Sequence, residues 1–333
     1  MRVPYDALRA EFERVLNKYG ITGERAVLSA RLFADASRDG IYTHGLNRFP
    51  KFIKSIENGS VDVNAGAEME CALGMLERWD GRRGCGNLNA WRCMERAIAL
   101  SKEHTIGVVA LRNTNHWMRP GNYGLQAVEK NCIGILWTNT VPNMPPWGGR
   151  DARLGNNPVV VAVPNGQEAP VLLDVAMSMF SYGKLESYAR SGRPLPVDGG
   201  FGPDQKLTKD AGEILKTHQA LPIGYWKGSG LSLVLDLVAS ALSGGRTSRE
   251  VGLLPAETEL SQVFMAIDLD SLPDREAFAA RVRDTLSDLV TSTPVEAGKD
   301  VYYPGFNMMR TRRENLEKGV PVEESVWQSV LEL

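Results

Sequence analysis

The sequence is poor in the residues that build metal and redox centres. Its 333 residues include only four histidines and four cysteines. The cysteines form no C-x-x-C pair, and none stands beside a histidine with zinc-finger spacing. We therefore expect no metal site, and we expect reduced, mostly buried thiols at Cys71, Cys85, Cys93 and Cys132.

The chain also lacks an excess of one charge and a long apolar run. It has 38 Lys and Arg residues against 40 Asp and Glu residues, for a formal net charge of −2. Such a balance provides no broad positive field for a nucleic-acid backbone or an anionic membrane. The longest apolar stretch, residues 231–242, is too short for a bilayer and contains Asp236, and the first residues do not resemble a signal peptide. We expect a cytoplasmic protein that binds neither nucleic acid nor membrane.

Common nucleotide and zinc fingerprints are missing as well. Neither G-x-x-x-x-G-K-[ST] nor H-E-x-x-H occurs, whereas GCGNLNA (84–90) matches G-x-G-x-x-x-A. A dinucleotide fingerprint needs a strand before it and an acidic residue after a second strand. The preceding LERWDGRR (76–83) is interpreted as a poor strand, and the following helix leads to Glu103 and His104. We interpret the glycine pattern as unrelated to a Rossmann site.

Apolar spacing nevertheless predicts an ordered α/β protein. Helices are predicted over residues 4–19 and 23–38, and a third is predicted to begin near residues 45–47 with Pro50 in its first turn. Runs rich in β-branched residues predict strands at 105–111, 132–138, 158–164, 171–176 and 263–269. Helical patterns return at 275–292, 307–319 and 323–333.

Strand follows strand with little helix between residues 132 and 176, which favours antiparallel pairing over a βαβ repeat. The predicted fold class is α/β of the α+β type, with a mostly antiparallel central sheet. Residues 67–270 are expected to form the mixed sheet domain. Residues 1–66 and about 271–333 are expected to form a helical domain around it.

The stretch IYTHGLNRFP (41–50) contains the first candidate for chemistry. In a helix, His44 and Arg48 would share one face at i and i+4. His44 would lie at or just before the helix N-terminus, where partial positive charge favours an anionic ligand. An imidazole that can be partly charged at neutral pH, beside a fixed cation, suits protonation of an oxo acid. The alternative is a solvated loop that enters a helix.

Three further segments place polar groups after strands or before a helix. LRNTNHWMRPGNYG (111–124) carries Asn115 and His116, and its alternative is a loop held by its own amides. LLDVAMSMFSYGK (172–184) suits close approach of a ring or ribose, or is a methionine-rich core edge. IGYWKGSG (223–230) combines Lys227 with backbone N–H groups that suit a pyrophosphate, or is a plain helix entry.

Taken together, the motifs THGLNRFPKFI, ALRNTNHWMRPGNYG, MPPWGG, DVAMSMFSYGKLE, LPVDGGF and GYWKGSGLSLVLD resemble those of the malate/L-lactate dehydrogenase family. The resemblance spans nearly the whole chain. It implies non-Rossmann NAD binding on a sheet wrapped by helices from both termini. It also implies a homodimer with the active site near the subunit interface, and NADH-dependent reduction of a 2-oxo acid, with NADPH as the alternative cofactor.

The resemblance also implies roles for individual residues. His44 would donate the proton, Arg48 would hold the substrate carboxylate, and His116 would act beside them as the alternative acid. Thr43 would support His44, and Asn115 would line the substrate site. The cofactor would contact Pro170, Val171, Leu172, Leu173, Asp174, Val175, Ala176, Trp226, Lys227, Gly305, Phe306 and Asn307.

The substrate stays open at this stage. Another 2-hydroxy-acid dehydrogenase of the family, acting on malate, lactate, ureidoglycolate or a cyclic imine, is the alternative within the enzyme class. Outside that class, the chain could be a non-catalytic small-molecule binding protein. A structural or nucleic-acid module is disfavoured because the sequence has no basic excess and no repeat.

Overall fold

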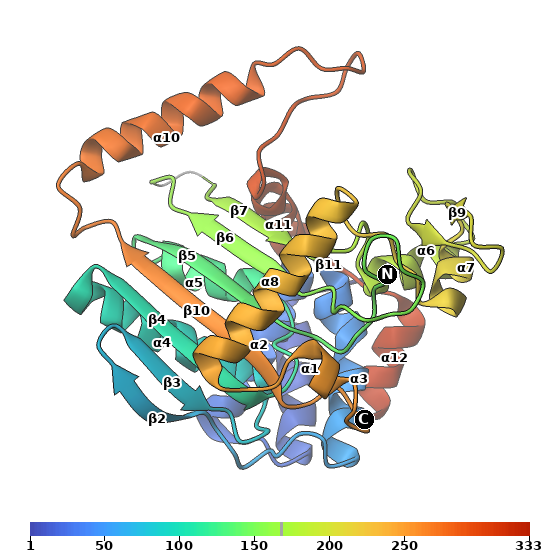
Figure 1. Ribbon diagram of the computed structural model, residues 1–333, viewed down its shortest axis with the longest axis horizontal. Coiled ribbons are helices and arrows are strands. Elements are labelled where there is room, and N and C mark those ends of the chain that lie inside the picture. The colour runs from blue at the N-terminus through green and yellow to red at the C-terminus, as the bar shows by residue number, and fades with distance from the viewer. Residues whose placement is uncertain (167–168) are drawn as a thin grey trace.

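A mostly antiparallel sheet forms the centre of the computed structural model, which describes residues 1–166 and 169–333 (Figure 1). Among these residues, seven strands pair in the order β2-β3-β4-β10-β5-β6-β7. Every neighbouring pair is antiparallel except β3 and β4. The strands are β2 (Glu68–Leu73), β3 (Leu76–Asp80), β4 (Ile106–Thr114), β5 (Cys132–Thr138), β6 (Val159–Val163), β7 (Val171–Val175) and β10 (Leu260–Asp268). The predicted fold class is confirmed.

The central strand β10 is buried on both faces, as its continuous apolar sequence requires. Phe264 lies opposite Val109 of β4 and Leu136 of β5, and packs under the helices α4 (Gly86–His104) and α5 (Gly121–Val128). Its neighbour Val263 points to the other face, where α8 (Trp226–Ser243) covers the sheet.

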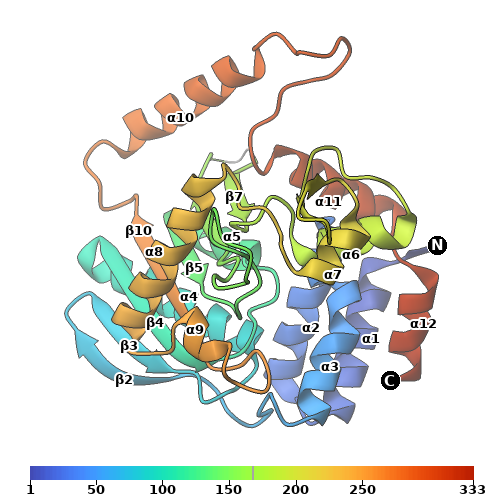
Figure 2. The ribbon, with the colours of Figure 1, turned by 45° about the vertical axis from the view of Figure 1, so that its right-hand side comes forward.

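A helical layer lies beside the sheet and is built from both ends of the chain (Figure 2). Its core includes the rings of Phe12, Phe33, Phe49 and Phe52, with the centroids of Phe12 and Phe49 4.3 Å apart. The short strands β1 (Arg2–Val3) and β11 (Val320–Pro321) pair antiparallel. The helices of this layer are α1 (Tyr5–Lys18), α2 (Gly23–Arg38), α3 (Phe49–Glu57), α11 (Phe306–Lys318) and α12 (Glu324–Glu332).

Two further parts complete the fold. A small lobe packs around Leu185, Leu195 and Ile214. It consists of α6 (Tyr182–Ser191), β8 (Gly200–Phe201), β9 (Leu207–Thr208) and α7 (Ala211–Thr217). The short helix α9 (Ser248–Val251) lies outside this lobe and precedes β10. The helix α10 (Arg275–Val290) extends away from the body and has no buried residue (Figure 1). The division into two domains stays a prediction.

Two local predictions are wrong. The third helix begins at Phe49, not near residues 45–47, and two short 3-10 helices precede it, η1 (Tyr42–His44) and η2 (Leu46–Arg48). His44 and Arg48 are therefore not an i, i+4 pair on an α-helix, and His44 is not at an α-helix N-terminus. Packing explains the break, because Ser37 of α2 accepts a hydrogen bond from the backbone N–H of Leu46 at 2.9 Å.

The segment interpreted as a poor strand is β3, which pairs parallel with β4 across the crossover helix α4. A βαβ unit therefore does surround the GCGNLNA motif, although Asn115, not an acid, follows β4. A Cβ at Gly86 would lie 2.3 Å from the carbonyl oxygens of both Asn115 and His116. The glycine lets α4 pack against the loop that carries His116.

No helix of the described residues is both long and apolar enough to cross a membrane. Cys71 is exposed, whereas Cys85, Cys93 and Cys132 are buried, and all four thiols are free.

Candidate active site

His44 reaches the site because the 3-10 turns fold tightly onto α2. A Cβ at Gly45 would lie 2.1 Å from Ser37 Oγ, so only glycine allows this close approach. Thr43 Oγ1 lies 3.3 Å from Nδ1 of His44. The Thr-His-Gly sequence thus combines a side-chain partner for the imidazole with the backbone freedom that places it.

His116 follows β4 and stacks beside His44. The ring centroids are 5.8 Å apart and the ring planes are 11° from parallel. The backbone N–H of Met118 donates to Nδ1 of His116 at 3.0 Å. This bond makes Nδ1 an acceptor, so the neutral ring carries its proton on Nε2 and can donate from there.

The surroundings of both imidazoles favour the neutral form. Burial, together with the charges of Arg48 and Arg119, lowers the pKa of His44 to about 4. Burial and the charge of Arg48 also lower the pKa of His116 well below its usual value. The lowered pKa of His44 differs from the expectation of a ring that is partly charged at neutral pH. An anionic ligand is needed to restore the proton.

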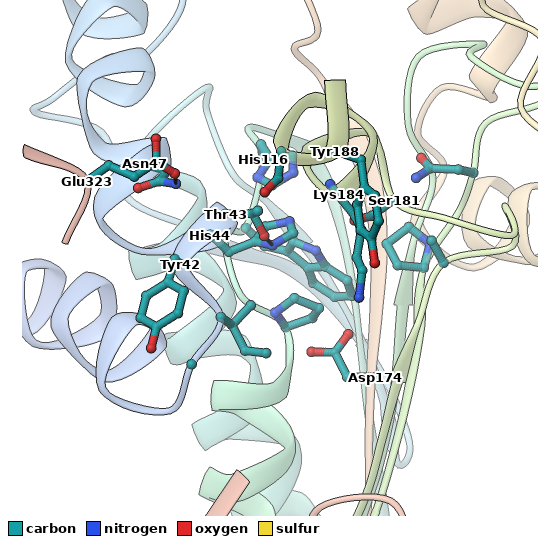
Figure 3. A pocket seen from close by; sticks show the side chains of 18 of the residues that line it. Tyr42, Thr43, His44, Asn47, His116, Asp174, Ser181, Lys184, Tyr188 and Glu323 are labelled. Atoms are coloured by element: carbon teal, nitrogen blue, oxygen red, sulfur yellow. Dashed lines mark hydrogen bonds between the residues drawn. The ribbon is translucent and has the colours of Figure 1, made fainter. Parts of the chain in front are cut away.

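Two lobes of one cavity meet at these histidines. Both are lined by Thr43, His44, Asn47, His116, Thr140, Asn156 and Ser181. The larger lobe, about 840 Å³, continues toward Asp174 of β7 and Tyr188 of α6. Figure 3 shows His116 at its upper end and Asp174 at its lower end. The smaller lobe, about 670 Å³, continues toward Arg48 and Glu257.

Arg48 is an available cation in the smaller lobe. Its guanidinium forms no ion pair with a carboxylate of the described residues. Burial lowers the pKa of Arg48, and the negative charges of Glu257 and Glu186 oppose that shift. A planar guanidinium without a bound carboxylate is suited to hold one from a ligand by two parallel hydrogen bonds.

Asn115 is buried, but its amide is occupied by the protein. It donates to the carbonyl oxygens of Arg83 at 2.7 Å and Gly84 at 3.0 Å. The side chain fixes the turn before α4 and lines a third cavity of about 270 Å³ next to His116. Its expected contact with substrate stays a prediction.

The expected cofactor residues fall into two places. The segments 170–176 and 305–307 lie together, since the N–H of Leu172 donates to the carbonyl of Pro304 at 2.9 Å. Asp174 and Ala176 line the larger lobe. Desolvation by the surrounding protein raises the pKa of Asp174. The positive charge of Arg119 and a hydrogen bond from the N–H of Gly121 act in the opposite direction and lower it. Trp226 and Lys227 lie instead at the exposed start of α8, outside the lining of either lobe.

Sequence reasoning missed the contribution of α6. Ser181 caps this helix by accepting a hydrogen bond from the N–H of Lys184, and both residues line the larger lobe. Lys184 and Arg193 lie over the ring of Tyr188, at 5.9 and 5.6 Å from its centroid. The segment 172–184 was recognised as a candidate site, but the serine three residues before Lys184 was not read as the N-cap of a helix. Glu257 was missed because it is distant in sequence from every motif.

Paired imidazoles beside a free arginine, in a cavity large enough for a cofactor and a small acid, fit a dehydrogenase that acts on hydroxy or oxo acids. The chain belongs to the malate/L-lactate dehydrogenase family, whose model matches residues 3–331. The family prediction is confirmed. Dehydrogenases of this family use a nicotinamide cofactor.

Individual relatives support the assignment over the full length. The chain is 44% identical over 332 residues to a 2,3-diketo-L-gulonate reductase of Citrobacter koseri, covering 99% of both chains. A malate dehydrogenase structure from Pyrococcus horikoshii has a TM-score of 0.89 at 29% identity, covering 100% of this chain and 94% of that one. A malate dehydrogenase from Entamoeba histolytica has a TM-score of 0.94 at 25% identity, with coverage of 100% and 96%.

Proposed function

We propose that the protein is an NADH-dependent reductase of a 2-oxo acid, and that its substrate is 2,3-diketo-L-gulonate, reduced to 3-keto-L-gulonate. One observation carries the reaction type: two stacked imidazoles line the junction of the two lobes, together with an arginine that forms no ion pair within the described residues. The full-length similarity to 2,3-diketo-L-gulonate reductases supports the choice of substrate.

In this proposal, Arg48 binds the substrate carboxylate in the smaller lobe. The bound carboxylate adds negative charge next to His44 and raises the pKa of that imidazole, so that the ring gains a proton as the complex forms. His44 then gives the proton to the carbonyl oxygen as negative charge develops there. His116, through Nε2–H, donates a hydrogen bond to the same oxygen or to a neighbouring hydroxyl, and Arg48 orients the ketone toward both rings.

The larger lobe fits a nicotinamide dinucleotide, which supplies the hydride when bound. Asp174 offers a carboxylate to ribose hydroxyls at one end of the lobe. Lys184 and Arg193 are exposed and form no ion pair with the described carboxylates, so they are available to an anionic diphosphate. Trp226 and Lys227 are retained as cofactor contacts in the proposal, which requires either a cofactor that extends beyond the lobe or a contribution across a subunit boundary.

We also propose a homodimer. The outward face of α8 is apolar and uncovered: Val234 is 53% and Leu237 is 52% exposed. Leu231 and Val238 extend the same face, on a helix whose opposite side packs on the sheet. A contiguous apolar helix face in water favours association with a second copy.

The association is tested by sedimentation of the wild type and of a Val234→Glu/Leu237→Glu variant. We expect a dimer for the wild type and a monomer for the variant. Leu316→Glu, at an equally exposed apolar position on α11, is the control and should leave the mass unchanged. A monomeric wild type at micromolar concentration would refute the dimer.

The activity is tested by following NADH and NADPH oxidation with 2,3-diketo-L-gulonate and a panel of simpler 2-oxo acids. Rapid NADH loss with diketogulonate supports the proposal. Preference for pyruvate, oxaloacetate or a cyclic imine would retain the family and change the substrate. Binding of NADH without turnover of any of these compounds would favour a binding protein.

A further inference from the structure

The smaller lobe contains opposite charges that do not neutralise one another in pairs. Arg48 forms no ion pair within the described residues, and neither does Glu257, although both line this lobe. Arg190, another cation of the lobe, is engaged with Glu323 at 3.3 Å. The lobe therefore presents one free guanidinium and a separate free carboxylate, with the ammonium of Lys51 at its exposed side.

Glu257 is held in place by the backbone of the facing loop. Its Oε1 accepts a hydrogen bond from the N–H of Val141 at 3.3 Å. The side chain is half-buried in the connection between α9 and β10 and also borders the third cavity. Glu186, on α6, adds a second negative charge to the lobe from its exposed side. The charges of both acids act on Arg48.

A carboxylate inside a partly enclosed cavity discriminates strongly between neutral and anionic groups. Hydroxyl groups of a ligand can donate hydrogen bonds to Glu257, whereas a ligand carboxylate would be repelled, because water in the cavity screens less than bulk water. Arg48 can neutralise one ligand carboxylate, and no other unpaired guanidinium of the described residues lines the lobe beside it. The ammonium of Lys51 also lines the lobe, but this side chain is exposed, so solvent screens its attraction for a second carboxylate.

We propose that Glu257, assisted by Glu186, restricts the site to oxo acids that have one carboxylate and an uncharged, hydroxylated tail, and that it excludes dicarboxylates. This proposal rests on the proposed oxo-acid reduction and specifies its substrate class. Glu257 determines specificity and is not a proton donor. The first carboxylate binds Arg48, and the tail extends toward Glu257 with its hydroxyls as donors.

The test compares kcat/KM for hydroxypyruvate, which has one carboxylate and a hydroxyl, with kcat/KM for oxaloacetate, which has two carboxylates. The wild type should prefer hydroxypyruvate. Glu257→Gln keeps the size of the side chain and an acceptor for Val141 but removes the charge. We expect it to shift the ratio toward oxaloacetate by about tenfold, and high salt should reduce the discrimination of the wild type.

Glu259→Gln is the matched control. Glu259 lies two residues away and pairs with Arg246 at 2.7 Å, outside the lining of either lobe. This variant should keep the wild-type ratio. Glu257→Ala also removes the acceptor for Val141, so it should raise KM for both substrates in addition to changing the ratio.

The outcomes separate the two proposals. Absence of turnover of every oxo acid by the wild type refutes the proposed function itself. Turnover with a wild-type preference for oxaloacetate overturns the role of Glu257. An unchanged ratio in Glu257→Gln overturns it as well, provided that kcat with hydroxypyruvate shows the variant to be folded and active.

Discussion

His44 and His116 stack with their planes 11° from parallel and share Arg48 as a cationic neighbour. Two imidazoles at this distance cannot both hold an extra proton, because the second proton would meet the charge of the first and that of the arginine. The pair is therefore expected to accept one proton at a time. This arrangement assigns one ring to proton donation and the other to hydrogen bonding.

His44→Ala should lower kcat for reduction by about 10²- to 10⁴-fold, the usual range for loss of a general acid. NADH affinity, measured by fluorescence titration, should change little, because the groups proposed to hold its ribose and diphosphate are untouched. His104→Ala, at the exposed end of α4, is the control and should keep wild-type rates. Near-normal turnover by His44→Ala would transfer the acid role to His116.

The pH dependence follows from the lowered pKa of His44. Reduction needs the protonated ring, and the free enzyme loses that proton as the pH rises through about 4. Between about pH 5 and 8, kcat/KM for reduction should fall about tenfold per unit, while kcat/KM for the reverse oxidation, which needs the neutral ring, should stay level. The kcat for reduction should decline only at higher pH, because bound substrate raises the pKa. A level kcat/KM for reduction across this range would contradict the assignment.

Arg48→Lys keeps the positive charge but loses the fork that binds two carboxylate oxygens. A charge-assisted hydrogen bond contributes about 1.5–3 kcal/mol, so KM for a 2-oxo acid should rise about 10- to 100-fold. Steady-state kinetics measure the effect. Arg281→Lys on the exposed face of α10 should leave KM unchanged. An unchanged KM in Arg48→Lys would place the carboxylate elsewhere.

Asp39 should be critical for stability. It is buried at the end of α2 and accepts hydrogen bonds from Arg119, from Arg38 at 2.8 Å and from Arg312 at 2.7 and 2.6 Å. Burial alone would raise the pKa of Asp39, but these three cations lower it below its usual range. Asp39→Asn would leave the buried guanidinium of Arg119 without a counter-charge, which should cost about 3–5 kcal/mol in the free energy of unfolding, whereas Arg38 keeps its ion pair with Asp35.

Denaturant unfolding measures this cost, with the exposed Asp6→Asn on α1 as the control. Because the folded-state pKa of Asp39 is depressed, its contribution is present above the unfolded-state pKa, about 3.9, and is lost as the pH falls toward the folded-state value. The difference between wild type and Asp39→Asn should therefore shrink in acid. An equal loss in the two variants would show that the network contributes nothing.

Gly305→Ala should destabilise the contact between α11 and β7. Gly305 has a φ of +99°, and a Cβ there would lie 2.4 Å from the carbonyl oxygen of Pro170. Gly298 has a similar φ of +80° but open space around it. Gly298→Ala therefore reports the backbone strain alone, about 1 kcal/mol. The thermal midpoint should fall further in Gly305→Ala, and equal midpoints would show that the segment moves freely.

Sequence patterns were sufficient to predict the main helices and five of the seven strands of the central sheet, β4, β5, β6, β7 and β10, because these strands contain runs rich in β-branched residues. They failed for β2, whose residues are all exposed, and for β3, whose Glu77 and Arg78 do not look like strand residues. β3 is held in the sheet by parallel pairing with β4, which follows it in the sequence only after helix α4. β2 is held in turn by its antiparallel pairing with β3. Local sequence does not record such tertiary pairing.

The site was predicted in part for a related reason. His44, Arg48 and His116 stand in recognisable motifs, and the structure brings them together. The lowered pKa of His44 comes mainly from burial and then from the charges of Arg48 and Arg119, and burial and the position of Arg119 cannot be read from spacing. Lys184 stands in a recognised motif but was given no role, and Glu257 stands in none, so their positions in the cavity followed from the fold and not from the sequence.

The pairing of β1 with β11 has a consequence for synthesis on the ribosome. Arg2 donates to the carbonyl oxygen of Gly319 at 2.7 Å, across a separation of 317 positions. The N-terminal helices therefore emerge long before the segment that completes their layer. The apolar face that α12 later covers stays exposed until nearly the whole chain has been synthesised. This delay slows closure of the helical layer and leaves the nascent protein accessible to chaperones.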